Sequence, residues 1–235
     1  GGSLLQTSVS NTVDATHIEI NFSSNVFFGQ SYSYRITFDM VDPGGAVDRD
    51  FRIGHSVAAF PVWAFGSDGS TGNSVAVVLP ATFTPSVYGG PLNQTIQADG
   101  SVRLAANVTD SPTWFAYVTA EGPGLFTTIP FTLTLGDQEA SVILRAWDDD
   151  PEWAARTQVL LTDGLPALQE LIGLRWAVFG DLKVEESANR LGDYAGIYNR
   201  TTEKINVRYD ADATVTLHEA AHIWFNDALF RDRWI

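Results

Sequence analysis

Two histidines four residues apart, with a glutamate directly after the first, are the residues of this sequence best suited to chemistry. They are His218, Glu219 and His222, in the run LHEAAHIWFND. Because neither proline nor glycine interrupts residues 213–234, we expect this segment to be helical. Residues four apart lie one above the other on a helix, so the two imidazoles can bind one tetrahedral zinc ion, Zn²⁺.

Glu219 would lie close to a metal ion held by the two histidines. Zinc lowers the pKa of a bound water to about 7, and a nearby carboxylate can then take a proton from that water as a general base. The alternative is an ordinary core helix in which this arrangement of three residues arises by chance. Burying three polar groups without partners would be costly. The pattern therefore favours a metal site, with His218 and His222 as ligands.

The elements just before this helix have to position it. Asp210 or Asp212 can cap its N-terminus by accepting hydrogen bonds from free backbone N–H groups. A hairpin is expected in AGIYN, RTTEK and INVRY, and a strand over 174–184. The order helix, strand, hairpin, helix predicts an α+β half.

The first helix of this half is expected to begin after three aspartates and a proline at 148–151. Carboxylates cap free N–H groups, and proline suits the first turn. The spacing of leucines predicts a helix over 152–172, which Gly164 and Pro166 should break or kink. A site for a hard cation is the alternative interpretation of the aspartates.

The first 145 or so residues alternate between apolar and polar side chains, a pattern typical of β-strands. SYSYRITFDM is the clearest example, and HIEINF is another. The turns Asp99–Gly100 and Gly136–Asp137 each predict a hairpin. Further strands are expected within 51–64, 74–88 and 113–120.

The predicted fold class is mainly β plus α+β. Seven or more short strands with regularly spaced turns predict an antiparallel β-sandwich over residues 1–147. Residues 148–235 are expected to form a partial catalytic domain of helix, strands, edge hairpin and the helix that carries the two histidines.

The run HEAAHIWFND resembles the H-E-x-x-H-x-W-F-G-N core of the aminopeptidase N-like gluzincins. In that family of zinc metallopeptidases an N-terminal β-sandwich precedes a thermolysin-like catalytic domain. The resemblance implies that His218 and His222 bind zinc and that Glu219 is the catalytic base. It also implies an edge strand near Gly196, Ile197 and Tyr198, along which an extended substrate would lie.

The sequence departs from the family pattern in three ways. The family's third zinc ligand, a glutamate on the following helix, would lie beyond Ile235, so we expect the isolated chain to be inactive. The G-x-M-E-N signature that binds the substrate amino terminus has no match. Glu185, Glu186 and Asp193 could replace it, although solvated loop charges are the alternative. The helical half of the catalytic domain is also missing.

The composition limits the compartment and the partners. The 235 residues carry a formal charge of −14, which argues against nucleic acid as a partner. Cysteine is absent, so a transition metal needs histidine and carboxylate ligands, and the chain has four histidines. No run is long enough to span a bilayer. A start without methionine suits a processed secreted or cell-envelope protein, and the preference for arginine over lysine hints at a bacterial source.

Several other residues are weaker candidates. His17 and His55 each stand alone in the strand half, where surface or core roles are favoured over ligation. Aromatic side chains near the motif are expected in the core, with lining of a substrate groove as the alternative. Two polar residues after them could orient a zinc-bound imidazole or simply be solvated. These are Trp224, Phe225 and Trp234, followed by Asn226 and Asp227.

The predicted function is zinc-dependent hydrolysis of a peptide or protein substrate by the complete protein, with Glu219 as the general base. The alternative is a non-catalytic binding or scaffold module, a β-sandwich with an incomplete zincin half. A zincin that hydrolyses another kind of bond is a third possibility. The sequence leaves the oligomeric state open.

Overall fold

The computed structural model describes residues 4–13, 16–42, 51–66, 72–122, 125–188 and 194–225. The chain forms two compact units, Gly1–Met40 and Val41–Ile235, and each is described by itself. Some residues singled out in the sequence lie outside the described ranges. These are Asp193, Asn226, Asp227 and Trp234.

The first unit contains one antiparallel hairpin, of β1 (Gln6–Asn11) and β2 (Thr16–Asn21). The strand expected in SYSYRITFDM is wrong, because residues 31–40 belong to no strand. Their apolar side chains are exposed, with Phe38 at 69%. Alternation selects the side chains that share one face, but a strand also needs a neighbour for its backbone N–H and C=O groups.

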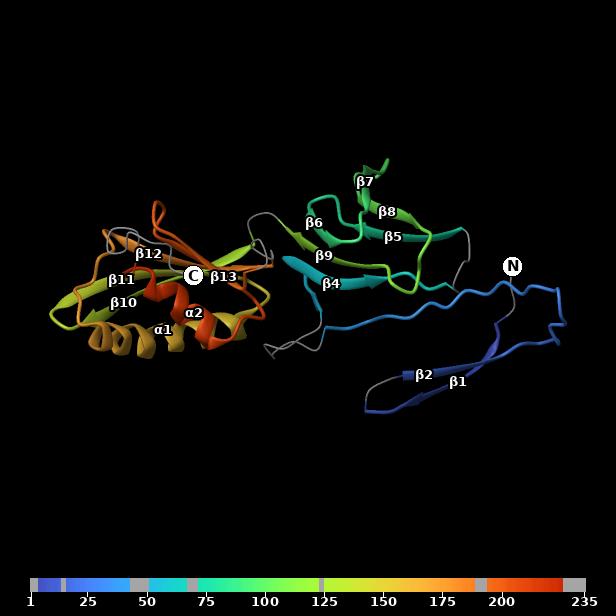
Figure 1. Ribbon diagram of the computed structural model, residues 1–235, viewed down its shortest axis with the longest axis horizontal. Coiled ribbons are helices and arrows are strands. Elements are labelled where there is room, and N and C mark those ends of the chain that lie inside the picture. The colour runs from blue at the N-terminus through green and yellow to red at the C-terminus, as the bar shows by residue number, and fades with distance from the viewer. Residues whose placement is uncertain are drawn as a thin grey trace. The chain divides into compact units, whose positions relative to one another are not determined.

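Two antiparallel sheets form the predicted β-sandwich within the second unit (Figure 1). Leu79, Val102 and Leu104 of one sheet share a buried cluster with Val118 and Ala120 of the other. The prediction of a sandwich is therefore confirmed as a fold class, with its described strands between Arg52 and Glu121. The first sheet has the order β3 (Arg52–Ile53), β4 (Val57–Trp63), β9 (Phe115–Glu121), β6 (Thr84–Gly89), and the second β5 (Asn73–Leu79), β8 (Val102–Val108), β7 (Asn93–Ile96).

A five-stranded mixed sheet follows the sandwich. Its strands are, in spatial order, β10 (Phe126–Leu135), β11 (Gln138–Trp147), β12 (Asp181–Ser187), β14 (Lys204–Arg208) and β13 (Gly196–Asn199). β12 runs parallel to both of its neighbours, and the two hairpins, β10–β11 and β13–β14, are antiparallel as predicted. β13 lies at one edge of the sheet.

This sheet crosses the domain boundary that the sequence places after residue 147. β10 and β11 precede that boundary, yet they pair with β12 and not with the sandwich strands. Alternation and a Gly–Asp turn predict a hairpin, but they do not say which sheet the hairpin joins. The strand expected over 174–184 also begins later, at Asp181.

The helix α1 (Pro151–Ile172) starts as predicted, with Asp150 at its N-cap accepting a hydrogen bond from the Trp153 N–H at 3.1 Å. Of the break or kink predicted at Gly164 and Pro166, the break is wrong, since one helix runs through both residues. Packing explains the glycine. A Cβ on Gly164 would lie 2.5 Å from Cδ2 of Leu217, so its absence allows the second helix to approach.

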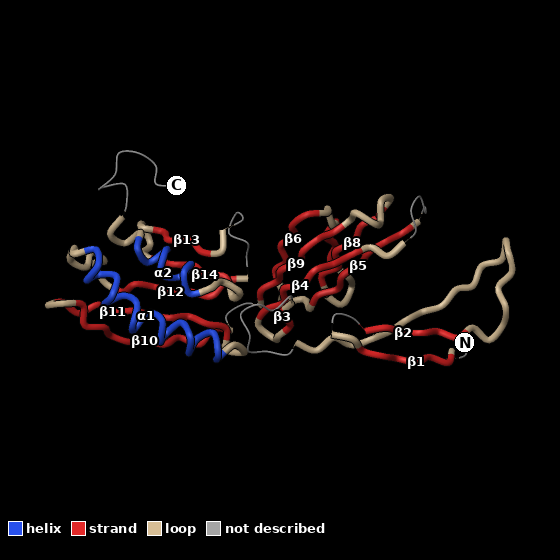
Figure 2. The backbone as a smooth tube through the Cα atoms, turned by 60° about the horizontal axis from the view of Figure 1, so that its bottom comes forward, coloured by secondary structure: helices blue, strands red, loops and turns tan. Residues whose placement is uncertain are grey.

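α1 and the second helix, α2 (Ala213–Ala221), lie together against the five-stranded sheet (Figure 2). Leu144, Val184 and Ile205 of the sheet are fully buried in one cluster with Leu161 and Leu165 of α1. The predicted fold class, mainly β plus α+β, is confirmed. Within the described ranges, no helix combines the length and the apolar character needed to cross a membrane.

Candidate metal centre

The helix α2 positions the histidine motif. Asp212 is its N-cap and accepts a hydrogen bond from the Val215 N–H at 3.0 Å, whereas Asp210 pairs with Arg208. The helix is shorter than expected: it ends at Ala221, and residues 222–224 form a turn. Of the two candidate N-cap residues, Asp210 and Asp212, the structure therefore selects Asp212.

His218, Glu219 and His222 lie together on α2. One potential ligand atom from each falls within 4.8 Å of the other two. The ring centroids of the two histidines are 5.0 Å apart, with the rings nearly perpendicular at 88°. Glu219 is 9% exposed, His222 is half-buried and His218 is exposed. His218 therefore faces solvent, and of the three polar groups that a core helix would have buried only Glu219 is almost fully buried.

Glu219 contacts the edge strand of the sheet. Its Oε2 accepts a hydrogen bond from the Tyr198 N–H at 2.9 Å. Gly196 comes close to the same side chain, because a Cβ built there would be 2.8 Å from Cγ of Glu219. The structure thus brings the motif beside the strand that the sequence analysis singled out. Ile197, between these two residues, is 41% exposed.

A backbone carbonyl lies beside the second histidine. Nδ1 of His222 is 3.3 Å from the carbonyl oxygen of Phe225. Metal-binding histidines commonly donate their other ring N–H to such a group, which fixes the tautomer and leaves Nε2 for the metal. Asn226 and Asp227, for which the sequence allows either this supporting role or simple solvation, lie outside the described residues.

The donor set fits a divalent transition metal. Two imidazole nitrogens and a carboxylate one residue away are ligand types that zinc accepts, and the spacing places them on one side of a helix. Among the residues that the structure describes, no other group of three or more histidine and carboxylate side chains is close enough to share an ion. His218 and His222 would hold the ion, with Glu219 next to it.

Glu185 and Glu186 lie on the strand β12. The alternative that they are solvated charges on a loop is therefore wrong. Glu185 pairs with Arg145 at 2.6 Å and with Lys204 at 2.8 Å. Glu186 is 1% exposed and pairs with Arg52. Both groups already have cationic partners within the second unit, so neither is open to the amino terminus of a substrate.

A buried ionic cluster around Arg52 was missed by the sequence analysis. The guanidinium of Arg52 lies 3.3 Å from Asp149 and 3.3 Å from Asp150, and it contacts Glu186 directly. Burial raises the pKa of Glu186 to about 8, against the lowering effect of Arg52. The three aspartates signalled a helix start, but nothing in the sequence marked a single arginine, roughly 100 residues earlier, as their partner.

The remaining candidates have ordinary roles. His17 is exposed on β2. His55 is also exposed; its Nε2 lies 3.0 Å from Asp148, and this hydrogen bond raises the pKa of the histidine. Trp224 is 2% exposed, and its ring centroid is 5.5 Å from that of Trp176, so its predicted core position is confirmed.

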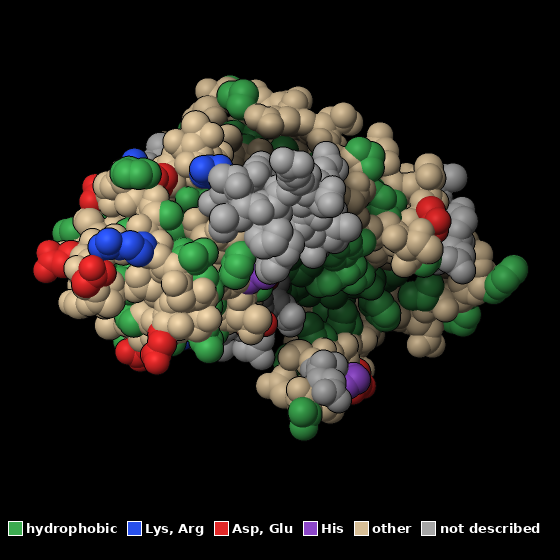
Figure 3. Space-filling model, turned by 60° about the vertical axis from the view of Figure 1, so that its left-hand side comes forward, with side chains coloured by type: hydrophobic (Ala, Val, Ile, Leu, Met, Phe, Trp, Pro, Cys, Tyr) green, Lys and Arg blue, Asp and Glu red, His purple; other side chains and the backbone are tan. Residues whose placement is uncertain are grey.

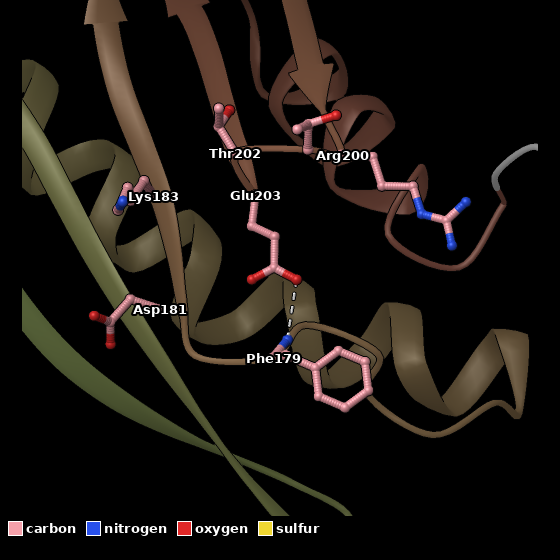
Figure 4. Close-up of a pocket in the computed structure, with 7 residues that line it drawn as sticks. Phe179, Asp181, Lys183, Arg200, Thr202 and Glu203 are labelled. Carbon is pink, nitrogen blue, oxygen red and sulfur yellow. Dashed lines mark hydrogen bonds between the residues drawn. The ribbon is translucent and has the colours of Figure 1, made fainter.

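A polar hollow of about 320 Å³ lies beside the start of β12 and the turn between β13 and β14. Figure 4 shows the Glu203 carboxylate accepting a hydrogen bond from the Phe179 N–H at 3.0 Å, while the Arg200 guanidinium extends away from Glu203. None of the three motif residues lines this hollow, so it is distinct from the candidate metal centre.

Comparison with known proteins gives structural neighbours only. No model of a protein family matches the chain, and no curated protein matches it. A two-domain M1 zinc metallopeptidase mutant bound to L-arginine is 15% identical with a TM-score of 0.35; the match covers 95% of this chain and 54% of that one. An M1 zinc metallopeptidase from Deinococcus radiodurans is 14% identical with a TM-score of 0.36, covering 94% and 52%.

A third neighbour is the Legionella pneumophila aminopeptidase A in complex with aspartic acid. It is 10% identical with a TM-score of 0.34, and the match covers 77% of this chain and 24% of that one. The chain described here spans about half the length of the two M1 metallopeptidases above.

Proposed function

We propose that this chain carries the metal-binding helix and the edge strand of a gluzincin-type, aminopeptidase N-like zinc metallopeptidase, and that the complete protein hydrolyses peptide bonds. The observation that carries the proposal is the clustering of His218, Glu219 and His222, whose potential ligand atoms lie within 4.8 Å of one another. Zinc bound by the two histidines would polarise the substrate carbonyl and lower the pKa of water to about 7.

Glu219 is the residue proposed to move the proton. Its carboxylate would accept a proton from the attacking water as the water oxygen bonds to the carbonyl carbon. It would then give this proton to the leaving nitrogen as the C–N bond breaks. The hydrogen bond from Tyr198 to Oε2 supports this role, because it holds the carboxylate in one orientation.

The edge strand is proposed to bind an extended peptide. Among the strands that the structure describes, β13 has a neighbour on one side only, so backbone groups on its other side face away from the sheet. Gly196, Ile197 and Tyr198 form this segment, and the glutamate of the motif lies directly beside it. Addition of a peptide as a further strand is a common way to bind extended chains.

The proposed partner is a peptide or protein and not a nucleic acid. The chain has 28 acidic and 14 basic residues, and acidic side chains are scattered over the face shown in Figure 3. Such a surface repels phosphate backbones. A secreted or cell-envelope location in a bacterium stays part of the proposal.

The substitution Glu219→Gln in the full-length protein tests the function. Gln has nearly the same shape but cannot accept the proton, so hydrolysis of a peptide library should fall by about 10²- to 10⁴-fold. Bound zinc, measured by atomic absorption, should stay unchanged. His218→Ala, as a control, should lose both zinc and activity. Unchanged hydrolysis by the Glu219→Gln protein would contradict the proposed role.

A further inference from the structure

The edge strand β13 directs alternate backbone groups away from the sheet. The Ala195 carbonyl accepts a hydrogen bond from the Arg208 N–H at 2.8 Å, which places this carbonyl on the β14 side. In an antiparallel pair, successive residues direct their N–H and C=O groups to opposite sides. The backbone groups of Gly196 and Tyr198 therefore point away from β14, towards the free edge.

One of these outward amides is already used. The Tyr198 N–H donates to Oε2 of Glu219 at 2.9 Å. A hydrogen bond to a carboxylate is stronger than one between neutral groups. The edge strand thus fixes one oxygen of the side chain that the proposed function makes the general base. The same contact occupies an N–H that an added peptide strand would otherwise find at this position.

Gly196 makes this contact possible. A Cβ at position 196 would lie 2.8 Å from Cγ of Glu219 and 2.8 Å from Cγ1 of Val215, both on α2. Carbon atoms in folded proteins do not approach so closely, because the optimal separation is about 3.5–4.0 Å. Any side chain there would therefore push α2 away from β13 or turn the Glu219 carboxylate. Close approach of two elements is the reason that glycine is needed here.

We infer that Gly196 is a positioning residue, whose missing side chain lets the Tyr198 amide hold the Glu219 carboxylate against the edge strand. The inference rests on the proposed function for the role of Glu219, but its geometry does not depend on a metal. It also refines the binding segment. Because the Tyr198 N–H is occupied, an extended peptide would use the backbone groups of Gly196 and the carbonyl of Tyr198.

Amide hydrogen exchange of Tyr198, followed by NMR on the 235-residue chain without metal, tests the inference. In the wild type, this edge amide should exchange slowly. Glu219→Ala should speed its exchange by about tenfold or more, since the acceptor is lost. Glu219→Gln retains an acceptor oxygen and should keep most of the protection. Gly196→Ala should speed Tyr198 exchange while the Asn206 amide of β14 stays protected.

Two further variants keep the test decisive. Val215→Ala alone should leave Tyr198 exchange unchanged. Gly196→Ala with Val215→Ala removes one of the two close contacts and so preserves folding, but the contact with Glu219 remains and Tyr198 should still exchange fast. Slow Tyr198 exchange in both the Glu219→Ala chain and this double variant would overturn the inference.

The proposed zinc site and the proposed positioning role of Gly196 can be tested separately. His218→Ala should abolish zinc binding but leave Tyr198 protection as in the wild type. In the full-length protein, Gly196→Ala should lower kcat with little change in KM, because a misplaced base slows the chemical step more than binding. A rise in KM at constant kcat would instead indicate that Gly196 serves substrate binding alone, and would contradict the inference.

Discussion

Two clusters of ionisable side chains in the second unit differ in what surrounds their charges. Around Arg52, three carboxylates contact one guanidinium, and Arg52 and Glu186 are 2% and 1% exposed. At the candidate metal centre, Glu219 is similarly shielded at 9% exposure, but His218 faces solvent. The first cluster has its cation built in. The second presents nitrogen and oxygen donors at an accessible surface, where an ion can bind.

The difference shows how burial and partners separate a structural cluster from a candidate site. A buried carboxylate needs a compensating charge. Arg52, on β3 of the sandwich, supplies this charge to Asp149 and Asp150 and also contacts Glu186 of β12. The guanidinium also lies 5.0 Å from the ring centroid of Trp147, which adds a cation–π contact. These contacts connect the sandwich to the mixed sheet.

Removal of Arg52 should have the largest effect on stability. Arg52→Ala would remove the cation that pairs with Asp149 and Asp150 and the hydrogen-bond donor that contacts Glu186, which costs about 3–5 kcal/mol. Arg145→Ala, the matched control, removes a 40% exposed partner of Glu185 and should cost less than about 1 kcal/mol. Urea unfolding of both variants measures the difference. Equal losses would mean that the Arg52 cluster is not a buried ionic core.

The second-largest expected effect is on the pH dependence of stability, which should come from Glu186 in the Arg52 cluster. Glu186 has a pKa raised from 4.5 to about 8, so the folded state holds a proton that the unfolded state releases above pH 4.5. The contribution of this proton uptake to the free energy of unfolding is fully present below pH 4.5 and is lost as the pH rises towards 8.

Between pH 5 and 8, wild-type stability should therefore fall relative to Glu186→Gln, by roughly 2–4 kcal/mol. Denaturant unfolding at several pH values gives the comparison. Parallel pH profiles for the two proteins would show that Glu186 is ionised in the folded state across this range.

The helix cap of α2 should have a smaller effect. Asp212→Ala removes the acceptor of the Val215 N–H and should cost about 1 kcal/mol in the free energy of unfolding. Asp163→Ala, in the exposed interior of α1, serves as the control and should cost nothing, because alanine is the better helix former. If the two substitutions had the same effect, Asp212 would not be a functional cap.

Local patterns predicted the elements better than their assembly. The turns at 99–100 and 136–137 gave the correct hairpins, and Asp150 gave the correct helix start. The assignment of β10 and β11 to a sheet was missed, since partner choice depends on long-range contacts. The α1 helix continued through Pro166 for a related reason. Tertiary packing outweighs the local preference of one residue.

The candidate site was predicted in part for the same physical reason. Helical spacing placed His218 and His222 side by side, and the helix geometry needs no other information. The contact between Glu219 and Tyr198 spans 21 residues and two elements, so spacing alone could not show it. The need for glycine at position 196 likewise emerges only when α2 lies beside β13.

X-ray absorption at the zinc edge tests the central claim most directly. The chain loaded with one equivalent of zinc should show scattering from two imidazole rings, with zinc–nitrogen distances of about 2.0–2.1 Å. His218→Ala and His222→Ala should each lose one ring, while exposed His17→Ala should leave the spectrum unchanged. A spectrum without imidazole scattering, or one that the two motif substitutions leave intact, would contradict the assignment of this helix as a metal centre.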